Sequence, residues 1–481
     1  MAQCAFAGKR FEPNTDVFLT MLLQLKENIL IINEPQKLIF QSPCTKIVWN
    51  TPSPCAYVCM NAFAKEGGEE EAVFSEILEQ EGEASAAKFL FFLERLKQHG
   101  FFVYHALFNG IPFASWVPLR ENFQFELHSP NTPLVLSRFC LIRLQERDWI
   151  LETPLFPGKI VLKHPLSTSI LHSFCNELTL QNLKEKFAEL PDSLIEDFIS
   201  LLFSTKIVAD PAEENTPLMM QWEFHDLYFH SRNRKGRHNN PSGGCYPFKG
   251  IIPAPETLKP LENFTTTPLF KPDIEQLKKQ DLPFTYVLET RRSTRQSNGT
   301  QLNINKLGEF LYRCARIKKM REPKTIRTMG LRTMGLSERP YPSAGALFEL
   351  EIYPVIHACA GIESGLYRYD PKEHQLLKYN GIDESVENLL ITSKHCMGSE
   401  QIPSILFVIT ARFPRVSWKY RSTAYSLILK NIGTLMQTMY LVATAMELAP
   451  CANGAGDSDL FSQIIGANYL EESSVGEFVL F

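Results

Sequence analysis

Two short runs in the C-terminal half of the sequence carry residue types suited to binding a phosphorylated, flat ligand. The first run, RRSTR, contributes three arginines and a serine: Arg291, Arg292, Ser293 and Arg295. Guanidinium forks and hydroxyl groups bind phosphate and polar sugar-like chains. The second run, PSAGA, consists of small residues around one glycine: Pro342, Ser343, Ala344, Gly345 and Ala346. Because small side chains let backbone N–H groups approach a ring closely, the pair favours a flavin mononucleotide (FMN) site over a generic basic surface.

The composition predicts a folded, cytoplasmic protein of about three domains. Of its 481 residues 44% are hydrophobic, and the net charge of −4 gives no reason to expect nucleic acid or an anionic membrane as a partner. The N-terminus lacks an apolar signal core, and no run is long enough to span a bilayer. The 11 cysteines include no CxxC pair, so we expect reduced thiols and no metal site.

Residues 16–212 contain one pattern of elements twice, which predicts two small winged-helix units. The first spans 16–117 and the second 120–212, and each combines strands with two helices. The helices are expected at 69–80, 86–99, 179–190 and 193–203. Neither unit has a second helix rich in Lys and Arg, so DNA binding is disfavoured. Binding a peptide by adding a strand to an exposed sheet edge is the better interpretation.

Residues 213–270 predict a linker dense in aromatic and basic residues. It either packs as a cap against the next domain or covers the ligand site. His225 and His230 are five residues apart, which does not suit a metal pair on one helical face.

The third domain is expected over 271–481, which makes the fold class α+β. Its main elements are predicted as a helix at 306–315, strands at 350–356, 365–370, 404–410 and 476–480, and a long apolar helix at 424–448. The pentapeptide RTMGL occurs twice, at 327–331 and 332–336, and predicts a flexible loop insertion.

Several ordered blocks resemble one enzyme family. They are RRSTR at 291–295, YPSAGALFELEIY at 341–353, GLYRYDPKEHQL at 365–376, IGTLMQTMYLVATAMEL at 432–448 and VGEF at 475–478. The domain resembles the FMN-dependent nitroreductase fold in its branch of thiazoline/oxazoline dehydrogenases, the SagB-type or McbC-like oxidases. The resemblance implies a homodimer with FMN at the subunit interface.

The two N-terminal units resemble PqqD-like peptide-recognition elements. Their fusion ahead of an oxidase domain is most similar to the cyanobactin thiazoline oxidases. The resemblance implies an azoline-bearing precursor peptide as substrate, with its leader bound by the N-terminal units, and a cyclodehydratase as partner.

The family's catalytic pair is an adjacent Lys-Tyr, which this sequence matches with Lys419-Tyr420, predicted at the start of the long helix. Aromatising an azoline requires a base for a proton and an acceptor for a hydride. A tyrosine is a poor base near neutral pH unless a cation stabilises its phenolate. Either Lys419 plays that part for Tyr420, or a desolvated Lys419 is itself the base.

The resemblance also assigns contacts with the flavin. The RRSTR residues fall at the phosphate and ribityl chain, and the PSAGA residues at the isoalloxazine edge. The segment with Gly454, Ala455 and Gly456 would donate a backbone N–H towards flavin N5, although Pro450 leaves the register of that contact open. Asn431 and Gln437 on the long helix are further candidates, with a satisfied buried amide as the alternative for each.

Two other functions remain open from the sequence. One is an NAD(P)H-dependent nitroreductase, and the other is a non-catalytic scaffold of a peptide-modifying complex. Since no dinucleotide fingerprint occurs, we expect molecular oxygen to reoxidise the flavin.

Overall fold

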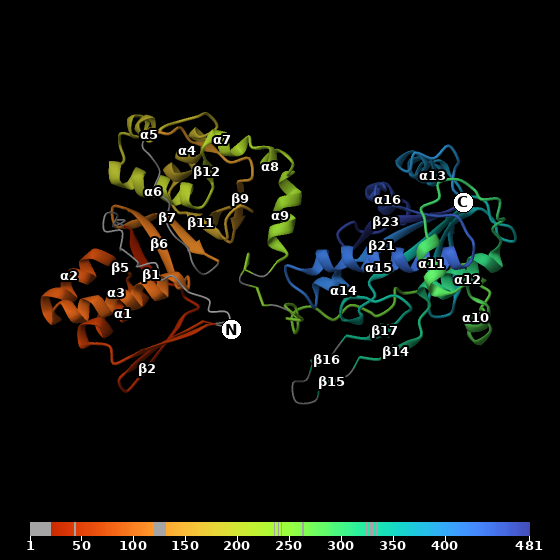
Figure 1. Cartoon of the computed structure of the whole chain (residues 1–481), viewed down its shortest axis with the longest axis horizontal. Coiled ribbons are helices and arrows are strands. Elements are labelled where there is room, and N and C mark those ends of the chain that lie inside the picture. The colour runs from red at the N-terminus through yellow and green to blue at the C-terminus, as the bar shows by residue number, and fades with distance from the viewer. Residues whose placement is uncertain are drawn as a thin grey trace, which may run out of the picture. The chain divides into compact units, whose positions relative to one another are not determined.

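The computed structural model describes residues 21–42, 45–119, 131–234, 236–238, 240–241, 243–261, 264–323, 325–326, 331–332 and 334–481. The chain forms two compact units, Met1–Asn239 and Asn240–Phe481 (Figure 1). The N-terminal segment 1–20, for which no signal core is predicted, and half of the RTMGL repeat (327–330 and 333) lie outside the described residues.

The first unit is built on a seven-stranded antiparallel sheet of order β5-β1-β6-β7-β11-β10-β9. These strands are β1 (Leu22–Leu25), β5 (Gly68–Glu69), β6 (Phe102–Phe108), β7 (Ile111–Pro118), β9 (Leu141–Gln145), β10 (Asp148–Glu152) and β11 (Gly158–Leu162). A three-stranded sheet joins β2 (Leu30–Glu34), β3 (Lys37–Gln41) and β4 (Lys46–Asn50). A short two-stranded sheet pairs β8 (Val135–Leu136) with β12 (Val208–Ala209). Pairing of β7 with β11 carries the large sheet across the predicted 117/120 boundary.

Helices cover this sheet and share one apolar core with it. They are α1 (Pro54–Lys65), α2 (Glu70–Glu81), α3 (Glu83–Gln98), α4 (Pro165–Ser173), α5 (Leu180–Lys186) and α6 (Asp192–Ser204). The short helices α7 (Pro211–Glu214), α8 (Pro217–Met220) and α9 (Phe224–Arg232) follow. The helices predicted at 69–80, 86–99 and 193–203 correspond to α2, α3 and α6, whereas α5 ends at Lys186, four residues before the predicted end.

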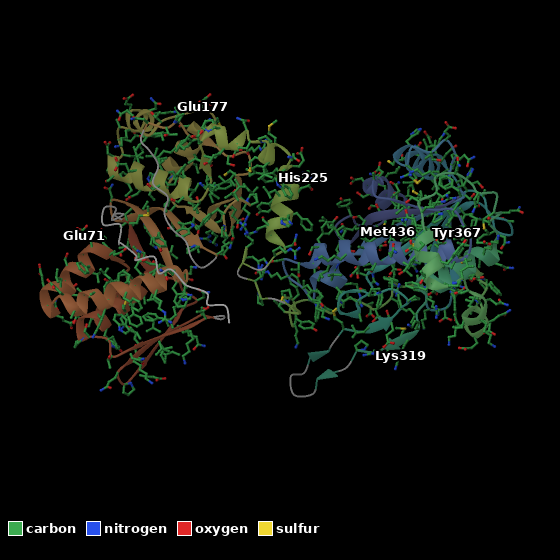
Figure 2. All side chains as sticks on the ribbon, in the orientation of Figure 1. Glu71, Glu177, His225, Lys319, Tyr367 and Met436 are labelled. Carbon is green, nitrogen blue, oxygen red and sulfur yellow. The ribbon has the colours of Figure 1, made fainter. Side chains whose placement is uncertain are left out.

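Charged and aromatic contacts hold α9 on the first unit. The buried Glu152 carboxylate accepts hydrogen bonds from Arg232, Arg143 and the Tyr228 hydroxyl at 2.9, 2.8 and 3.1 Å. His225 lies on α9 (Figure 2), with its side chain 78% exposed, and His230 stacks on Trp222 instead. The aromatic part of the predicted linker is therefore a structural element of this unit.

The second unit is a seven-stranded antiparallel sheet of order β13-β20-β19-β18-β21-β23-β22 with helices on both faces (Figure 1). The strands are β13 (Thr266–Pro268), β18 (Leu350–Ile356), β19 (Gly365–Asp370), β20 (Gln375–Asn380), β21 (Ile405–Arg412), β22 (Pro450–Asn453) and β23 (Glu472–Leu480). The helices are α10 (Ile274–Gln280), α11 (Phe284–Thr290), α12 (Ile304–Ala315), α13 (Glu384–Cys396), α14 (Phe413–Ser417), α15 (Ala424–Ala445) and α16 (Ser458–Ile464).

The sequence of β21 shows why both faces are covered. Phe407 and Ile409 pack with α12 and α15, and the alternating Leu406 and Val408 pack with α13 and α16. Successive side chains of a strand point to opposite faces, so a strand that is apolar throughout needs a helical layer on each side. Two small hairpins extend from this unit: β14 (Lys319–Arg321) with β17 (Leu336–Glu338), and β15 (Thr325–Ile326) with β16 (Leu331–Arg332).

Candidate active site

The arginine run follows α11 and is anchored to the long helix α15. The Arg291 guanidinium lies 5.3 Å from the centre of the Tyr440 ring, and Ser293 Oγ is 2.8 Å from the Tyr440 hydroxyl. The Thr294 N–H donates to the carbonyl of Pro450 at 2.7 Å. These contacts fix the backbone of the run. The side chains of Arg292 and Arg295 take no part in them and remain available to a ligand.

Arg292 and Arg295 are exposed beside a cavity of about 530 Å³. The cavity is lined by residues 292–296 and by 398–401, which include Glu400. Within the described part of the chain, neither arginine forms an ion pair. Guanidinium groups that no carboxylate neutralises are suited to a phosphate.

Residues 342–346 form a tight turn, called here the glycine turn, and a buried polar network holds it. The Ala344 N–H donates to Asn431 Oδ1 at 3.0 Å, and Asn431 Nδ2 donates to Glu349 Oε1 at 2.8 Å. Ser343 Oγ donates to Glu349 Oε2 at 3.2 Å. Asn431 therefore contacts the turn directly. Glu349, which the sequence analysis did not single out, is fully buried beneath it, and this burial raises its pKa.

The glycine turn has an uncommon backbone. Gly345, Ala346 and Phe348 have φ values of 62°, 57° and 48°, in the left-handed region. Non-glycine residues are rarely found there, so the surrounding network has to maintain the conformation. The turn presents the Cα of Gly345 to the Lys-Tyr pair.

Lys419 and Tyr420 lie between α14 and α15, so the prediction that they begin the long helix was wrong. The Lys419 Nζ lies 5.3 Å from the centre of the Tyr420 ring and 3.4 Å from the carbonyl oxygen of Gly345. A Cβ atom built on Gly345 would come within 2.4 Å of Lys419 Nζ and 2.6 Å of the Tyr420 hydroxyl. Both functional groups thus meet at the same point above the glycine turn, because the loop after α14 is not helical.

Electrostatics distinguish the two members of the pair. Burial, and then the positive charge of Arg415, lower the pKa of Lys419. Burial, and then Tyr246, raise the pKa of Tyr420. A neutral amine is therefore easier to form here than a phenolate, which favours Lys419 over Tyr420 as the base.

Part of the predicted linker covers the lysine. The N–H groups of Cys245 and Tyr246 both donate to the carbonyl oxygen of Lys419, at 3.0 and 3.1 Å. The side chain of Lys419 also packs close to Gly244. Residues 244–246 thus contribute to the partial burial of the amine.

The segment after α15 is exposed at Gly454, Ala455 and Gly456. Its shape depends on Glu477, which is buried and accepts a hydrogen bond from Asn453 Nδ2 at 2.9 Å. Asn453 Oδ1 in turn accepts the N–H of Ala455 at 3.1 Å. Burial raises the pKa of Glu477 to about 7. A Cβ on Gly456 would lie 1.9 Å from the Glu477 carboxyl group, so this glycine is needed for the close approach.

Gln437 is exposed on α15, and its side chain is not a satisfied buried amide. Asn431 is buried and hydrogen bonded, six residues earlier on the same helix. The two candidates therefore differ, and only Asn431 contacts another predicted site residue in the described part of the chain.

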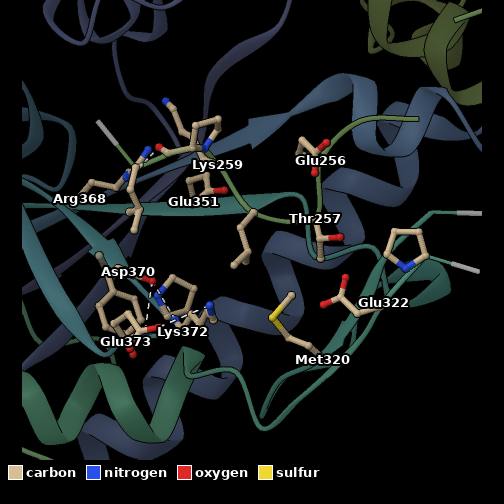
Figure 3. Close-up of a pocket in the computed structure, with 16 residues that line it drawn as sticks. Glu256, Thr257, Lys259, Met320, Glu322, Glu351, Arg368, Asp370, Lys372 and Glu373 are labelled. Atoms are coloured by element: carbon tan, nitrogen blue, oxygen red, sulfur yellow. Dashed lines mark hydrogen bonds and ion pairs between the residues drawn. The ribbon is translucent and has the colours of Figure 1, made fainter. Parts of the chain in front are cut away.

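A separate cavity of about 450 Å³ lies between the segment 256–261 and strands β18 and β19 (Figure 3). None of its lining residues was predicted to bind the flavin. Arg368, at its wall, donates to the carbonyl of Pro260 at 2.9 Å, and Glu351 lies 3.5 Å from Arg412. The buried charged groups of this cavity already have partners within the domain. The glycine turn and the arginine run therefore remain the better candidate site.

Among the described residues, no group of His, Cys, Asp and Glu side chains is arranged to hold a metal ion. The described helices likewise include none that is long and apolar enough to cross a membrane.

Three family models match consecutive parts of the chain. A ThcOx helix-turn-helix domain matches residues 17–127, the cyanobactin oxidase ThcOx matches 134–239, and the nitroreductase family matches 288–476. The chain therefore has the architecture of the nitroreductase superfamily, with a helix-turn-helix domain ahead of the nitroreductase domain. More particularly, its N-terminal half carries the domains of the cyanobactin oxidase ThcOx. The predicted fold class and family resemblance are confirmed.

Individual proteins are also similar to parts of the chain. A protein named "Putative nitroreductase" from Methanocaldococcus jannaschii is 29% identical over 184 residues, 38% of this chain and 82% of that protein. The trifolitoxin-processing protein TfxB of Rhizobium leguminosarum bv. trifolii is 26% identical over 142 residues, 29% of this chain but only 38% of that protein. Among solved structures, the E. coli microcin synthetase McbBCD complex with truncated pro-MccB17 bound has a chain 17% identical, with a TM-score of 0.32; the match covers 44% of this chain and 83% of that one.

Proposed function

We propose that this protein is an FMN-dependent dehydrogenase that oxidises thiazoline or oxazoline rings in a ribosomal precursor peptide. The observation that carries the proposal is the meeting of Lys419 Nζ and the Tyr420 hydroxyl at the Cα of Gly345. A base and a hydrogen-bond donor thus lie beside the turn predicted to line the flavin. The match of residues 134–239 to a cyanobactin oxidase supports the same class of reaction.

The residues present fit FMN. The exposed guanidinium groups of Arg292 and Arg295 would hold its phosphate, and the glycine turn would lie along its ring system, where the absence of a Cβ on Gly345 lets the Lys419 amine and the Tyr420 hydroxyl come close. Bound FMN supplies a hydride acceptor at N5. Molecular oxygen would be the final oxidant, taking up two electrons and two protons to give hydrogen peroxide.

Lys419 has the chemistry required of the base. Aromatisation removes a proton from the ring carbon derived from Cα and a hydride from the carbon derived from Cβ, and the electron pair left by the proton forms the new ring double bond. The Lys419 amine, whose pKa is lowered, accepts the proton. Tyr420, whose pKa is raised, keeps its proton and can donate a hydrogen bond to the substrate.

The N-terminal unit offers an edge for the leader peptide. β9 lies at one end of the strand order and is five residues long, whereas β5 at the other end has two. Ile142 and Leu144 of β9, and Trp149 opposite Leu144 on β10, are exposed apolar side chains. We propose that the leader adds to β9 as a further strand, since such an edge supplies backbone hydrogen bonds and side-chain contacts together.

The second unit offers a surface for a second copy of the chain. Phe284, Tyr286 and Leu288 of α11 are 68, 54 and 40% exposed, and this helix leads directly into Arg291. We propose that a homodimer covers α11, which would place the flavin site beside the subunit interface. Large exposed apolar side chains that adjoin a binding site are typical of such an interface.

The test is mass spectrometry of an azoline-bearing peptide incubated with the protein and FMN, in the presence and absence of the leader. We expect the loss of two hydrogen atoms per ring, slowed without the leader. Lys419→Met should lower the rate by ~10²–10⁴-fold, as for a removed general base, and retain bound flavin. The matched control is Lys430→Met, an exposed lysine on α15, which should leave the rate unchanged.

Three outcomes would count against the proposal. A Lys419→Met variant that oxidises azolines at the normal rate would exclude the lysine as base. Rapid bleaching of bound flavin by NADPH, with no change in the peptide mass, would favour a nitroreductase instead. A protein that cannot be reconstituted with FMN would favour the scaffold function.

A further inference from the structure

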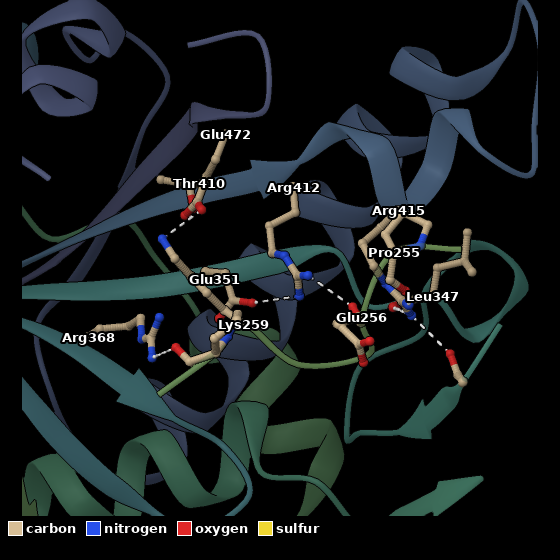
Figure 4. A network of polar contacts seen from close by, with 12 residues as sticks. Pro255, Glu256, Lys259, Leu347, Glu351, Arg368, Thr410, Arg412, Arg415 and Glu472 are labelled. Atoms are coloured by element: carbon tan, nitrogen blue, oxygen red, sulfur yellow. Dashed lines mark hydrogen bonds and ion pairs between the residues drawn. The ribbon is translucent and has the colours of Figure 1, made fainter. Parts of the chain in front are cut away.

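Arg415 of α14 is the most deeply buried cation near the candidate site. Its exposed fraction is 0%, and in the described part of the chain its guanidinium donates only to backbone carbonyl oxygens (Figure 4). Nη1 donates to Pro255 at 3.0 Å, while Nη2 donates to Gly335 at 3.1 Å and to Leu347 at 2.7 Å. The three acceptors come from segments far apart in the sequence, so one side chain ties these segments to α14.

The guanidinium has no carboxylate partner within ion-pair distance among the described residues. The two nearby carboxylates are engaged elsewhere: Glu351 lies 3.5 Å from Arg412, and Glu349 accepts hydrogen bonds from Asn431 and Ser343. Burial, with repulsion from Arg412 and Arg339, lowers the pKa of Arg415 to about 10. The group therefore stays charged at neutral pH although removal from water is costly for a cation.

The position of Arg415 links the two halves of the candidate site. Leu347, whose carbonyl it binds, immediately follows the glycine turn. In the other direction, the N–H groups of Lys419 and Tyr420 both donate to the carbonyl of Val416, at 3.1 and 2.9 Å. The Lys-Tyr pair is thereby held one turn beyond the buried guanidinium.

We propose that Arg415 is a positioning residue, which fixes the glycine turn against the Lys-Tyr segment and places a permanent positive charge four residues before Lys419. This inference rests on the proposed function, because it assigns Lys419 rather than Tyr420 as the proton acceptor. It explains why a buried arginine bound only to carbonyl groups stands four residues before the lysine.

The other groups around Lys419 agree with this role. Tyr420 lies beside it in the chain, Cys245 and Tyr246 contact its backbone from the first residues of the same unit, and Gly345 presents a carbonyl group from the turn. Burial comes first and Arg415 second among the causes that lower the Lys419 pKa, and no carboxylate in the described residues opposes them. A neighbouring cation disfavours the ammonium form of the lysine.

The inference can be tested by titrating Lys419 directly. Lysines labelled by reductive methylation with ¹³C-formaldehyde are followed by NMR across pH in the FMN-free full-length protein, and the Lys419 signal is assigned by its absence in Lys419→Met. We expect Lys419 to titrate below the usual range of a lysine ammonium group. Arg415→Met should move the Lys419 titration to higher pH and shift the acid limb of the azoline oxidation profile in the same direction, whereas Arg415→Lys should retain both.

Each possible result either supports or overturns the proposed role of Arg415. A wild-type Lys419 that titrates in the usual range of a lysine ammonium group overturns the inference without any variant, so poor folding of Arg415→Met cannot hide the answer. If Arg415→Lys and Arg415→Met both leave the Lys419 titration unchanged, the positive charge has no role. If the titrations behave as expected but no azoline is oxidised, the charge effect stands and the proposed reaction fails.

Discussion

Replacing Gly345 by alanine gives the sharpest single test of the candidate site. The added Cβ would stand 2.4 Å from Lys419 Nζ and 2.6 Å from the Tyr420 hydroxyl, whereas real Cβ contacts essentially never fall below 3.0 Å. Both groups must therefore withdraw from the point at which they meet. The backbone cost is separate: at φ 62°, an alanine loses roughly 1–2 kcal/mol relative to glycine.

The two effects predict different magnitudes in different assays. Displacing a catalytic group by ~1 Å can lower a rate by ~10²-fold, so we expect azoline oxidation to fall by about that factor. The thermal stability should fall only by the ~1–2 kcal/mol of backbone strain. The rate is measured by mass spectrometry at saturating FMN, and stability by thermal unfolding.

The matched control is Gly381→Ala, where a Cβ meets no atom within 4 Å and the backbone is not left-handed. We expect this variant to keep wild-type activity and stability. A Gly345→Ala variant with undiminished turnover would show that the convergence of Lys419 and Tyr420 on the turn has no catalytic importance, and the reasoning would fail. If the variant instead loses activity only because it no longer folds, the displacement of the catalytic groups cannot be separated from the backbone strain, and this part of the reasoning is refuted.

Three further predictions concern the flavin, pH and assembly. Arg292→Ala should weaken FMN binding by about 10- to 100-fold, as expected for the loss of a charge-assisted hydrogen bond. Flavin fluorescence measures the binding, and Arg321→Ala, at an exposed arginine, is the control. Glu477 has a folded pKa of about 7, above its unfolded value of ~4.3, so its contribution to stability is fully present below pH ~4.3 and is lost as the pH rises through 7. Glu477→Gln should therefore raise the melting temperature more at pH 8 than at pH 5, and an equal effect at both values would contradict the assignment. Tyr286→Ser on α11 should shift the mass measured by light scattering from dimer to monomer, while the same change at the exposed Tyr469 should not.

Local patterns were sufficient where a strand or helix is buried on a regular face. The strands predicted at 350–356 and 365–370 coincide with β18 and β19, and the helix at 424–448 corresponds to α15. β20 and α13 were missed, although both belong to the same domain. The sequence of β20, QLLKYN, lacks a strict alternation, and it becomes a strand because β19 and β13 pair with it on either side.

The charged residues that organise the site could not be predicted in the same way. Arg415, Glu349 and Glu477 are single charged residues within ordinary segments, and nothing local indicates that each is almost fully buried. The partners that bind them are distant in the chain, as with the contact of Arg415 to Pro255. Only such long-range contacts bury a commonplace charged residue beside the candidate site.

The sequence by itself determined the residue types at the candidate site: three arginines in a run of five residues, small residues around Gly345, and the adjacent Lys419 and Tyr420. The tertiary structure decided that Lys419 and Tyr420 lie outside the long helix and meet at Gly345. It also decided which of the two is easier to deprotonate, because burial and the charge of Arg415 act through space. The sequence shows which chemical groups are available. The distances between these groups and the dielectric environment around them set their chemistry, and both exist only once the chain has folded.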